Sequence, residues 1–158
     1  MSAYPLSGFR FRVRFAGMEE EVDTSFQEVN GLELGVETEE LREGGAAGFT
    51  YRLPKRLKAG ELELKRGLPL HSKLSQWVQD ALENFEFKPL LVTVELLGEN
   101  HKPLMAWEAH QAWPLRWALS SFHAEESKVV IETLKLAYAK LRMTQQKSSA
   151  WSWLELVS

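Results

Sequence analysis

The side chains best suited to catalysis or metal binding are few and scattered. The histidines at positions 71, 101, 110 and 123 form neither an HExxH nor an HxH pattern. The nearest group of ligands is His123-Ala-Glu125-Glu126, but a metal site needs convergent ligands that further hydrogen bonds hold in place. A loop histidine beside solvated glutamates explains this group better, so the sequence predicts neither a metal site nor a cofactor.

The sequence also lacks the signatures of common enzyme classes. It contains no GxSxG, P-loop or GxGxxG pattern, and Gly44-Gly45 is not followed by the GK[ST] of a phosphate-binding loop. The absence of cysteine excludes a thiolate nucleophile, a disulfide framework and a cysteine-ligated metal. A hydrolase would need a pocket of convergent polar groups, which cannot be located from the sequence. We therefore predict that the protein is not an enzyme.

Aromatic and basic clusters suggest two kinds of binding. Trp107, Trp113 and Trp117 could line a sugar platform, as in a monomeric carbohydrate-binding β-sandwich. Such residues more often fill a β core or a subunit interface, and we favour that interpretation. The short basic run RLPKRLK is weak support for nucleic-acid binding in a chain with a net charge of −3.

Length and composition indicate one ordinary globular domain. The chain has 158 residues, of which 44% are hydrophobic and 26% charged, enough for a real hydrophobic core. The negative net charge gives no bulk attraction to nucleic acid or to an anionic membrane. The start MSAYPLSGF lacks the features of a signal peptide, and no stretch is apolar and long enough to span a bilayer. The lack of cysteine fits folding in a reducing cytoplasm.

The segment FRFRVRF, residues 9–15, alternates strictly between apolar and basic residues. Such alternation predicts a β-strand, because successive side chains point to opposite faces of a sheet. One face carries phenylalanines and Val13, and the other carries Arg10, Arg12 and Arg14. An arginine row is costly if buried alone, so it is either solvated or paired with carboxylates on another strand or subunit.

The first half of the chain is predicted to be largely extended. Residues 26–41 are expected to be extended, with a turn or bulge at Asn30-Gly31. The glycine-rich segment 42–49 is expected to be a loop that YRLPKRLK continues, because Pro54 disfavours a central strand. GELELKRG, residues 60–67, predicts a strand with Leu62 and Leu64 facing the core.

A single helix is predicted over HSKLSQWVQDALENF, residues 71–85. Its apolar residues recur at helical spacing and form one stripe, namely Leu74, Trp77, Val78, Ala81, Leu82 and Phe85. Ser72 is the expected N-cap, and Pro89 blocks continuation of the helix.

The second half predicts more strands. LLVTVELL and LMAWEAHQAW form a hairpin around the turn GENHKP, and Pro114 is expected to interrupt the chain before a short extended piece over 115–119. Residues 128–141 are expected to form a strand whose parity changes between Ile131 and Leu134. Together, the predicted elements indicate a mainly β protein, an antiparallel β-barrel or sandwich with one flanking α-helix.

Several segments, taken in order, resemble the tail tube proteins of contractile-tail phages. They are YPLSGFRFRVRF, FQEVNGLELGVETEELREG with its following glycine-rich loop, GELELKRG leading into the tryptophan-bearing helix, and MAWEAHQAWPLRW followed by ESKVVIETLKLAY. The resemblance covers about residues 4–143. The same family supplies the inner tube of phage tail-like contractile injection particles, and its fold is akin to the type VI secretion tube.

The resemblance implies a structural role. Six copies close into a ring whose inner wall is a continuous sheet, and the rings stack into a hollow tube inside a contractile sheath. The implied partners are further copies of the chain, the sheath protein, and baseplate, spike-hub and tube-end proteins, without nucleic-acid sequence recognition or membrane insertion. Assembly is expected in the bacterial cytoplasm, as part of a phage tail or of a phage tail-like particle that can act outside the cell.

The resemblance also suggests roles for particular residues. The loop over about 42–58 would reach a neighbouring subunit or ring through Arg42, Glu43, Gly44, Gly45, Pro54 and Lys55. In a ring, the arginine row could face the lumen or pair with carboxylates such as Glu37 and Glu39, and we favour pairing.

The expected tube domain spans residues 1–143, and residues 144–158 form a polar linker and an apolar extension. Exposed Trp151, Trp153, Leu154 and Leu156 would be an aggregation liability, so this tail is expected either to pack on the protein or to dock on a baseplate, cap or terminator component. A baseplate-proximal ring that initiates the tube is therefore the alternative to the bulk tube subunit.

Overall fold

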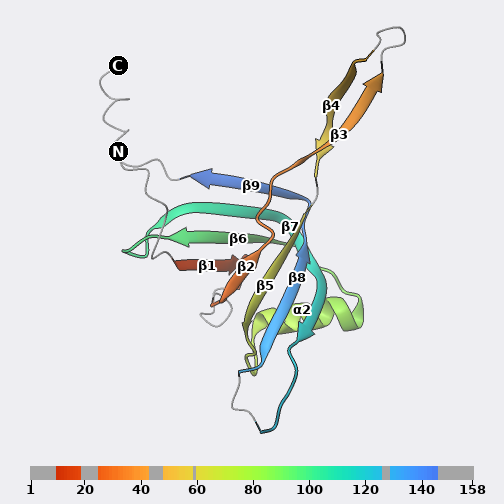
Figure 1. The fold of residues 1–158 in the computed structure, drawn as a ribbon. Coiled ribbons are helices and arrows are strands. Elements are labelled where there is room, and N and C mark those ends of the chain that lie inside the picture. The colour runs from red at the N-terminus through yellow and green to blue at the C-terminus, as the bar shows by residue number, and fades with distance from the viewer. Residues whose placement is uncertain (1–9, 19–24, 43–47, 59, 126–128, 146–158) are drawn as a thin grey trace.

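A computed structural model describes residues 10–18, 25–42, 48–58, 60–125 and 129–145 (Figure 1). It confirms the predicted fold class, since the chain is mainly β, with antiparallel strands and one long helix. The elements are β1 (Arg10–Phe15), β2 (Glu28–Asn30), β3 (Val36–Arg42), β4 (Thr50–Leu57), β5 (Glu61–Gly67), α2 (Lys73–Asn84), β6 (Leu90–Leu97), β7 (Pro103–Leu119), β8 (Ile131–Ala137) and β9 (Lys140–Gln145).

The long strand β7 joins two β-layers. Its first part pairs with β6 on one side and β9 on the other, while its last part pairs with β8. The first layer therefore has the strand order β1-β6-β7-β9, and the second has the order β2-β5-β8-β7. The two groups of strands run in clearly different directions in Figure 1, with α2 beside the second layer.

The core lies where the apolar faces of both layers meet the helix. Its largest fully buried side chains include Phe15 from the first layer and Leu64 and Leu134 from the second. The Trp77 ring of α2 meets the Phe15 ring edge-on with centroids 6.0 Å apart, and its Nε1 donates to the Lys88 carbonyl at 2.8 Å. The predicted strand 60–67 is confirmed as β5, with Leu62 and Leu64 buried.

The predicted helix is confirmed, although its apolar stripe is shorter than expected. Ser72 is the N-cap, and its Oγ accepts a hydrogen bond from the Ser75 amide at 3.0 Å. Phe85 ends the helix in a left-handed conformation with φ of 56° and is largely exposed, and Leu82 is also exposed. Helical spacing continues past the point where the core ends, so the last two residues of the predicted stripe are not part of the core.

Two expectations about strands in the second half are also wrong. Pro114 does not interrupt β7, because it is buried next to a register shift, where the lack of an amide hydrogen costs no regular ladder bond. The parity of β8 does not change either, since the buried positions are Glu132, Leu134 and Leu136. A buried glutamate, Glu132, shares the parity of the buried leucines, and this charge made the pattern look like a change of face.

The predicted strand over 128–141 is in fact two strands in different layers. The chain leaves β8 at Tyr138, and the Ala139 amide donates to the His110 carbonyl at 2.9 Å as β9 starts beside β7. Because β9 continues to Gln145, Thr144 and Gln145 pair with β7 instead of beginning the expected linker.

The segment expected to be a continuing loop is instead strand β4. It pairs with β3 in a two-stranded arm that projects away from both layers (Figure 1). The register skips Lys55 between the pairs Glu37–Arg56 and Thr38–Pro54, so the proline sits at a bulge. Proline excludes only a central strand, and an isolated hairpin has no central strand.

Candidate assembly surfaces

The first layer ends in an open strand edge on each side. Within the described part of the chain, β1 pairs with β6 and otherwise makes one isolated bridge, from Phe15 to Met18, while β9 pairs only with β7. Each outer edge therefore presents backbone donors and acceptors without strand partners, which invites pairing with another chain. Because all three pairings in this layer are antiparallel, β1 and β9 also run in opposite directions.

The β3–β4 arm is the most exposed part of the described fold. Nearly all its side chains are exposed, including the apolar residues Leu41, Tyr51 and Leu53. The register places these three on one face, because Leu41 lies opposite Tyr51 and Glu39 lies opposite Leu53. A two-stranded ribbon buries little surface by itself, so an apolar face on such an arm is typical of a contact with another molecule.

The arginine row points away from the core, and within the chain its ion-pair partner is Glu95 on β6. Arg12 lies 2.5 Å and Arg14 2.8 Å from the Glu95 carboxylate, which is almost fully buried beneath them. The carboxylates that the sequence suggested lie elsewhere. Glu37 pairs with Arg56 inside the arm, and Glu39 stands opposite Leu53. Arg10 has no ion pair among the described residues.

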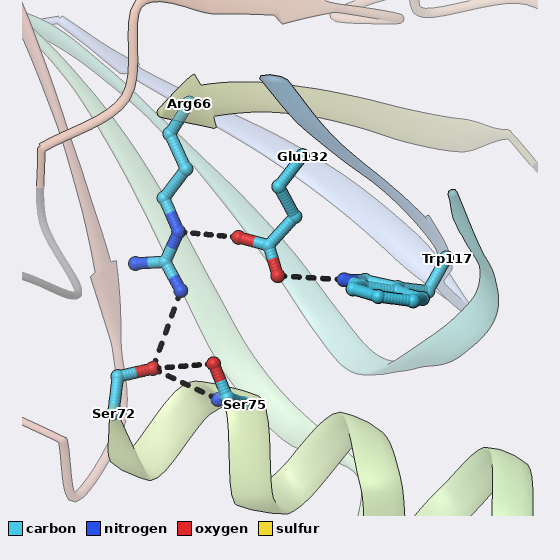
Figure 2. Close-up of polar contacts among 5 residues, drawn as sticks. All are labelled: Arg66, Ser72, Ser75, Trp117 and Glu132. Carbon is cyan, nitrogen blue, oxygen red and sulfur yellow. Dashed lines mark hydrogen bonds and ion pairs between the residues drawn. The ribbon is translucent and has the colours of Figure 1, made fainter. Parts of the chain in front are cut away.

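A buried polar network fastens the helix to the second layer (Figure 2). Arg66 on β5 donates to Glu132 on β8 at 2.7 Å and to the N-cap Ser72 at 3.3 Å. The second Glu132 oxygen accepts from Nε1 of Trp117 at 2.6 Å. The Arg66 guanidinium also lies 5.0 Å from the centre of the Phe26 ring.

The sequence patterns did not predict this network, and its role is to hold the fold together. Glu132 lines an apolar groove of about 370 Å³ beside α2, yet both its oxygens are already occupied. A carboxylate held in this way is poorly suited to acid–base work in the groove. A sequence signal did exist, because Arg66 and Glu132 both fall on the buried parity of their strands.

The structure gives little support to a sugar platform or a metal centre. Trp107 packs against the core, Trp113 meets the Phe87 ring edge-on with centroids 5.4 Å apart, and Trp117 donates to Glu132. No group of three potential ligands forms a metal site among the described residues, which do not include Glu126. No helix in the described ranges is long and apolar enough to cross a membrane.

Some predicted site residues lie outside the described ranges. These are Glu43, Gly44 and Gly45 of the loop, and Trp151, Trp153, Leu154 and Leu156 of the tail. Of the remaining loop residues, Arg42 ends β3 opposite Thr50, while Pro54 and Lys55 lie at the bulge of the arm. The structure thus brings Arg42, Pro54 and Lys55 together on one exposed hairpin.

Comparison with known proteins gives a consistent picture. The family model described as T4-like virus tail tube protein gp19 matches residues 7–142. A chain of the anti-feeding prophage baseplate is 30% identical, with a TM-score of 0.78 over 94% of this chain and 100% of that one. No curated protein sequence matches the chain.

More distant structures share the fold. A chain of the PVC extracellular contractile injection system sheath-tube complex is 22% identical, with a TM-score of 0.75 over 91% of this chain and 94% of that one. Hcp1 from Flavobacterium johnsoniae is 14% identical, with a TM-score of 0.55 over 86% and 95%. The family match covers most of the chain, and the chain belongs to the T4-like virus tail tube protein family, whose members are structural components of tails and not enzymes.

Proposed function

We propose that six copies of this chain close into a ring, and that the rings stack into the hollow inner tube of a contractile injection system. The observation that carries this proposal is the pair of open edges, β1 and β9, at opposite sides of one antiparallel layer. Since these strands run in opposite directions, β9 of one subunit can pair with β1 of the next and continue the same sheet. Head-to-tail contacts of this kind form a ring when the rotation between neighbours closes, and the ring leaves no edge of the first layer exposed.

The arm supplies a second contact in this proposal. Its apolar face, formed by Leu41, Tyr51 and Leu53, would be covered by a neighbouring subunit or the adjacent ring. Arg42 and Pro54 lie on the opposite face of the same hairpin, and they and Lys55 would contribute further contacts from there. The sheath protein and the baseplate and tube-end proteins are the further partners, with assembly in the bacterial cytoplasm and activity as part of the finished particle.

A second candidate function is the ring nearest the baseplate. The chain with 30% identity belongs to a baseplate structure, and it is covered over its full length. In this variant of the proposal, the chain forms a ring that initiates the tube, and the tail with Trp151, Trp153, Leu154 and Leu156 docks on a baseplate component.

Sedimentation velocity and negative-stain electron microscopy of the purified protein test both candidates. Six-membered rings that stack into tubes are expected for the bulk subunit, and rings that do not stack are expected for the initiating ring. A protein that remains monomeric even when co-expressed with the sheath and baseplate proteins of its own particle would contradict both.

A further inference from the structure

The face of the first layer that points away from the core is strongly charged. The register places alternate residues of its four strands on this face, which we call the charged face. Its polar and small residues are Arg10, Arg12, Arg14, Thr93, Glu95, Ala106, Glu108, His110, Lys140, Arg142 and Thr144, and β6 also places Leu91 and Leu97 there, with Leu97 opposite Arg10. The opposite face of the same strands supplies Val13, Phe15, Val94 and Leu141 to the core.

Positive charge prevails on the charged face, although the whole chain has a net charge of −3. Glu95 is shared by Arg12 and Arg14, so one carboxylate offsets only one of the two guanidinium groups. Glu108 stands opposite Arg142 in the register, and its Oε2 lies 3.3 Å from Nε2 of His110.

The outer strands add cations that are not offset. Arg10 on β1 and Lys140 on β9 are both exposed, and neither has an ion pair in the described part of the molecule.

The proposed ring determines where this face lies. If β1 and β9 of neighbouring copies pair, the first layers form a closed cylinder of strands. The second layer, α2 and the core all lie on the other side of this layer (Figure 1). They cannot fit inside a cylinder built from their own sheets, so they stand outside and the charged face lines the lumen.

We propose that this lumen wall is electropositive and favours acidic polypeptides as cargo. The proposal rests on the proposed function, because only ring closure turns the charged face inward. In a ring of six subunits, the six copies of each unpaired cation form a circle around the channel. A concave wall of low-dielectric protein concentrates the field of such charges. An acidic chain would be attracted to the lumen along its whole length.

The composition of the face favours a polypeptide over nucleic acid. The described residues of this face include no phenylalanine, tyrosine or tryptophan, so it lacks the aromatic platforms on which single-stranded bases stack. Because Arg12 and Arg14 already share the Glu95 carboxylate, their contacts with cargo would be weak, which suits passage through a channel better than tight retention.

The test uses assembled rings or tubes whose formation electron microscopy has already verified. Failure to assemble counts against the proposed function, whereas failure to bind counts against this inference. Fluorescent poly-glutamate, poly-lysine of the same length and a single-stranded oligonucleotide are co-sedimented with the assemblies. We expect about tenfold more retention of poly-glutamate than of poly-lysine. Raising the salt concentration from about 50 mM to about 300 mM should largely abolish the difference.

Charge reversal on the charged face and elsewhere on the subunit shows where the peptide binds. The variant R10E/K140E should lose the preference for poly-glutamate, whereas the control K88E/R116E makes the same change of charge at exposed sites after α2 and in the second layer and should keep it. If R10E/K140E does not assemble, R10Q/K140Q removes the same two cations without adding carboxylates. Equal retention of both peptides, equal loss in the control, or stronger retention of the oligonucleotide would overturn the proposal.

Discussion

Arg66 and Glu132 form a buried ion pair directly across strands β5 and β8, with Nε 2.7 Å from Oε2 and side chains only 2% and 5% exposed. The same pair reaches the helix cap through Ser72 and the last part of β7 through Trp117 (Figure 2). It therefore ties together every element around the groove beside α2. Its contribution can be measured because the same two strands carry a matched exposed pair.

Removing one partner of the buried pair should be severely destabilising. Glu132→Gln leaves the Arg66 charge buried without its counter-ion, and we expect a loss of about 3–5 kcal/mol in the free energy of unfolding. The double variant R66M/E132L should cost less than either single change, because no charge remains buried. Urea unfolding of the dissociated subunit, followed by tryptophan fluorescence, measures all three values.

The control uses Glu63, which pairs with Lys135 across the same two strands at 3.8 Å but is partly exposed. Glu63→Gln should change the free energy of unfolding by less than about 1 kcal/mol. Similar losses for Glu132→Gln and Glu63→Gln would show that burial adds nothing to the first pair.

The Ser72 cap should matter for the stability of α2. Ser72→Ala removes the acceptor for the Ser75 amide and should cost about 1 kcal/mol in the free energy of unfolding. Ser72→Asp should restore it, because a carboxylate caps the helix and faces the Arg66 guanidinium. A loss with aspartate as large as with alanine would mean that the serine acts by its size and not as a cap.

Tyr138 should make the subunit sensitive to alkaline pH. Burial, and to a smaller extent the charge of Glu33, raises the pKa of Tyr138 above its ordinary value of 10.0. The unfolded chain therefore loses this proton first, and the stabilisation present below about pH 10 declines as the pH rises towards the folded-state pKa. The Tyr138 hydroxyl has no hydrogen-bond partner among the described residues, so Tyr138→Phe should cost little at neutral pH.

Urea unfolding at neutral pH and above pH 10 compares the two proteins. The stability of Y138F should decline less steeply with pH than that of the wild type. Parallel declines would assign the alkaline sensitivity to other groups.

Sequence patterns predicted the elements whose burial follows a simple period. Strand β5, the β6–β7 hairpin and the buried stripe of α2 were predicted because their apolar residues alternate or recur at helical spacing. Glu132 broke the pattern in β8, since a charge on the buried parity looks like a change of face. Its burial depends on Arg66, which is distant in the sequence, and the pattern of one strand cannot supply that information.

The site was harder to predict than the fold. The alternation in β1 predicted an arginine face, but the choice of Glu95 over Glu37 depends on the pairing of β1 with β6. Pro54 hid the β4 strand, because the rule against proline in a central strand says nothing of a free arm. The open edges of β1 and β9 follow from topology alone, so no single motif reveals them.

The apolar face of the arm should be needed for assembly and not for folding. L41S/Y51S removes two exposed side chains that lie opposite each other, so the unfolding free energy of the subunit should stay within about 0.5 kcal/mol of the wild type. Assembly measured by sedimentation should be lost. Glu99→Ser, at an exposed turn residue outside the arm, is the control and should assemble normally. Normal assembly of L41S/Y51S would remove the arm from the proposed contacts.

Hydrogen exchange followed by mass spectrometry tests ring closure most directly, by comparing assembled particles with dissociated subunits. Pairing of β9 with β1 of the next copy should protect amides within Arg10–Phe15 and Lys140–Gln145, while β8, already paired on both sides, should change little. Protection that appears in both edge strands only on assembly is the predicted result. Edge strands that exchange as fast in assembled rings as in free subunits would contradict the account.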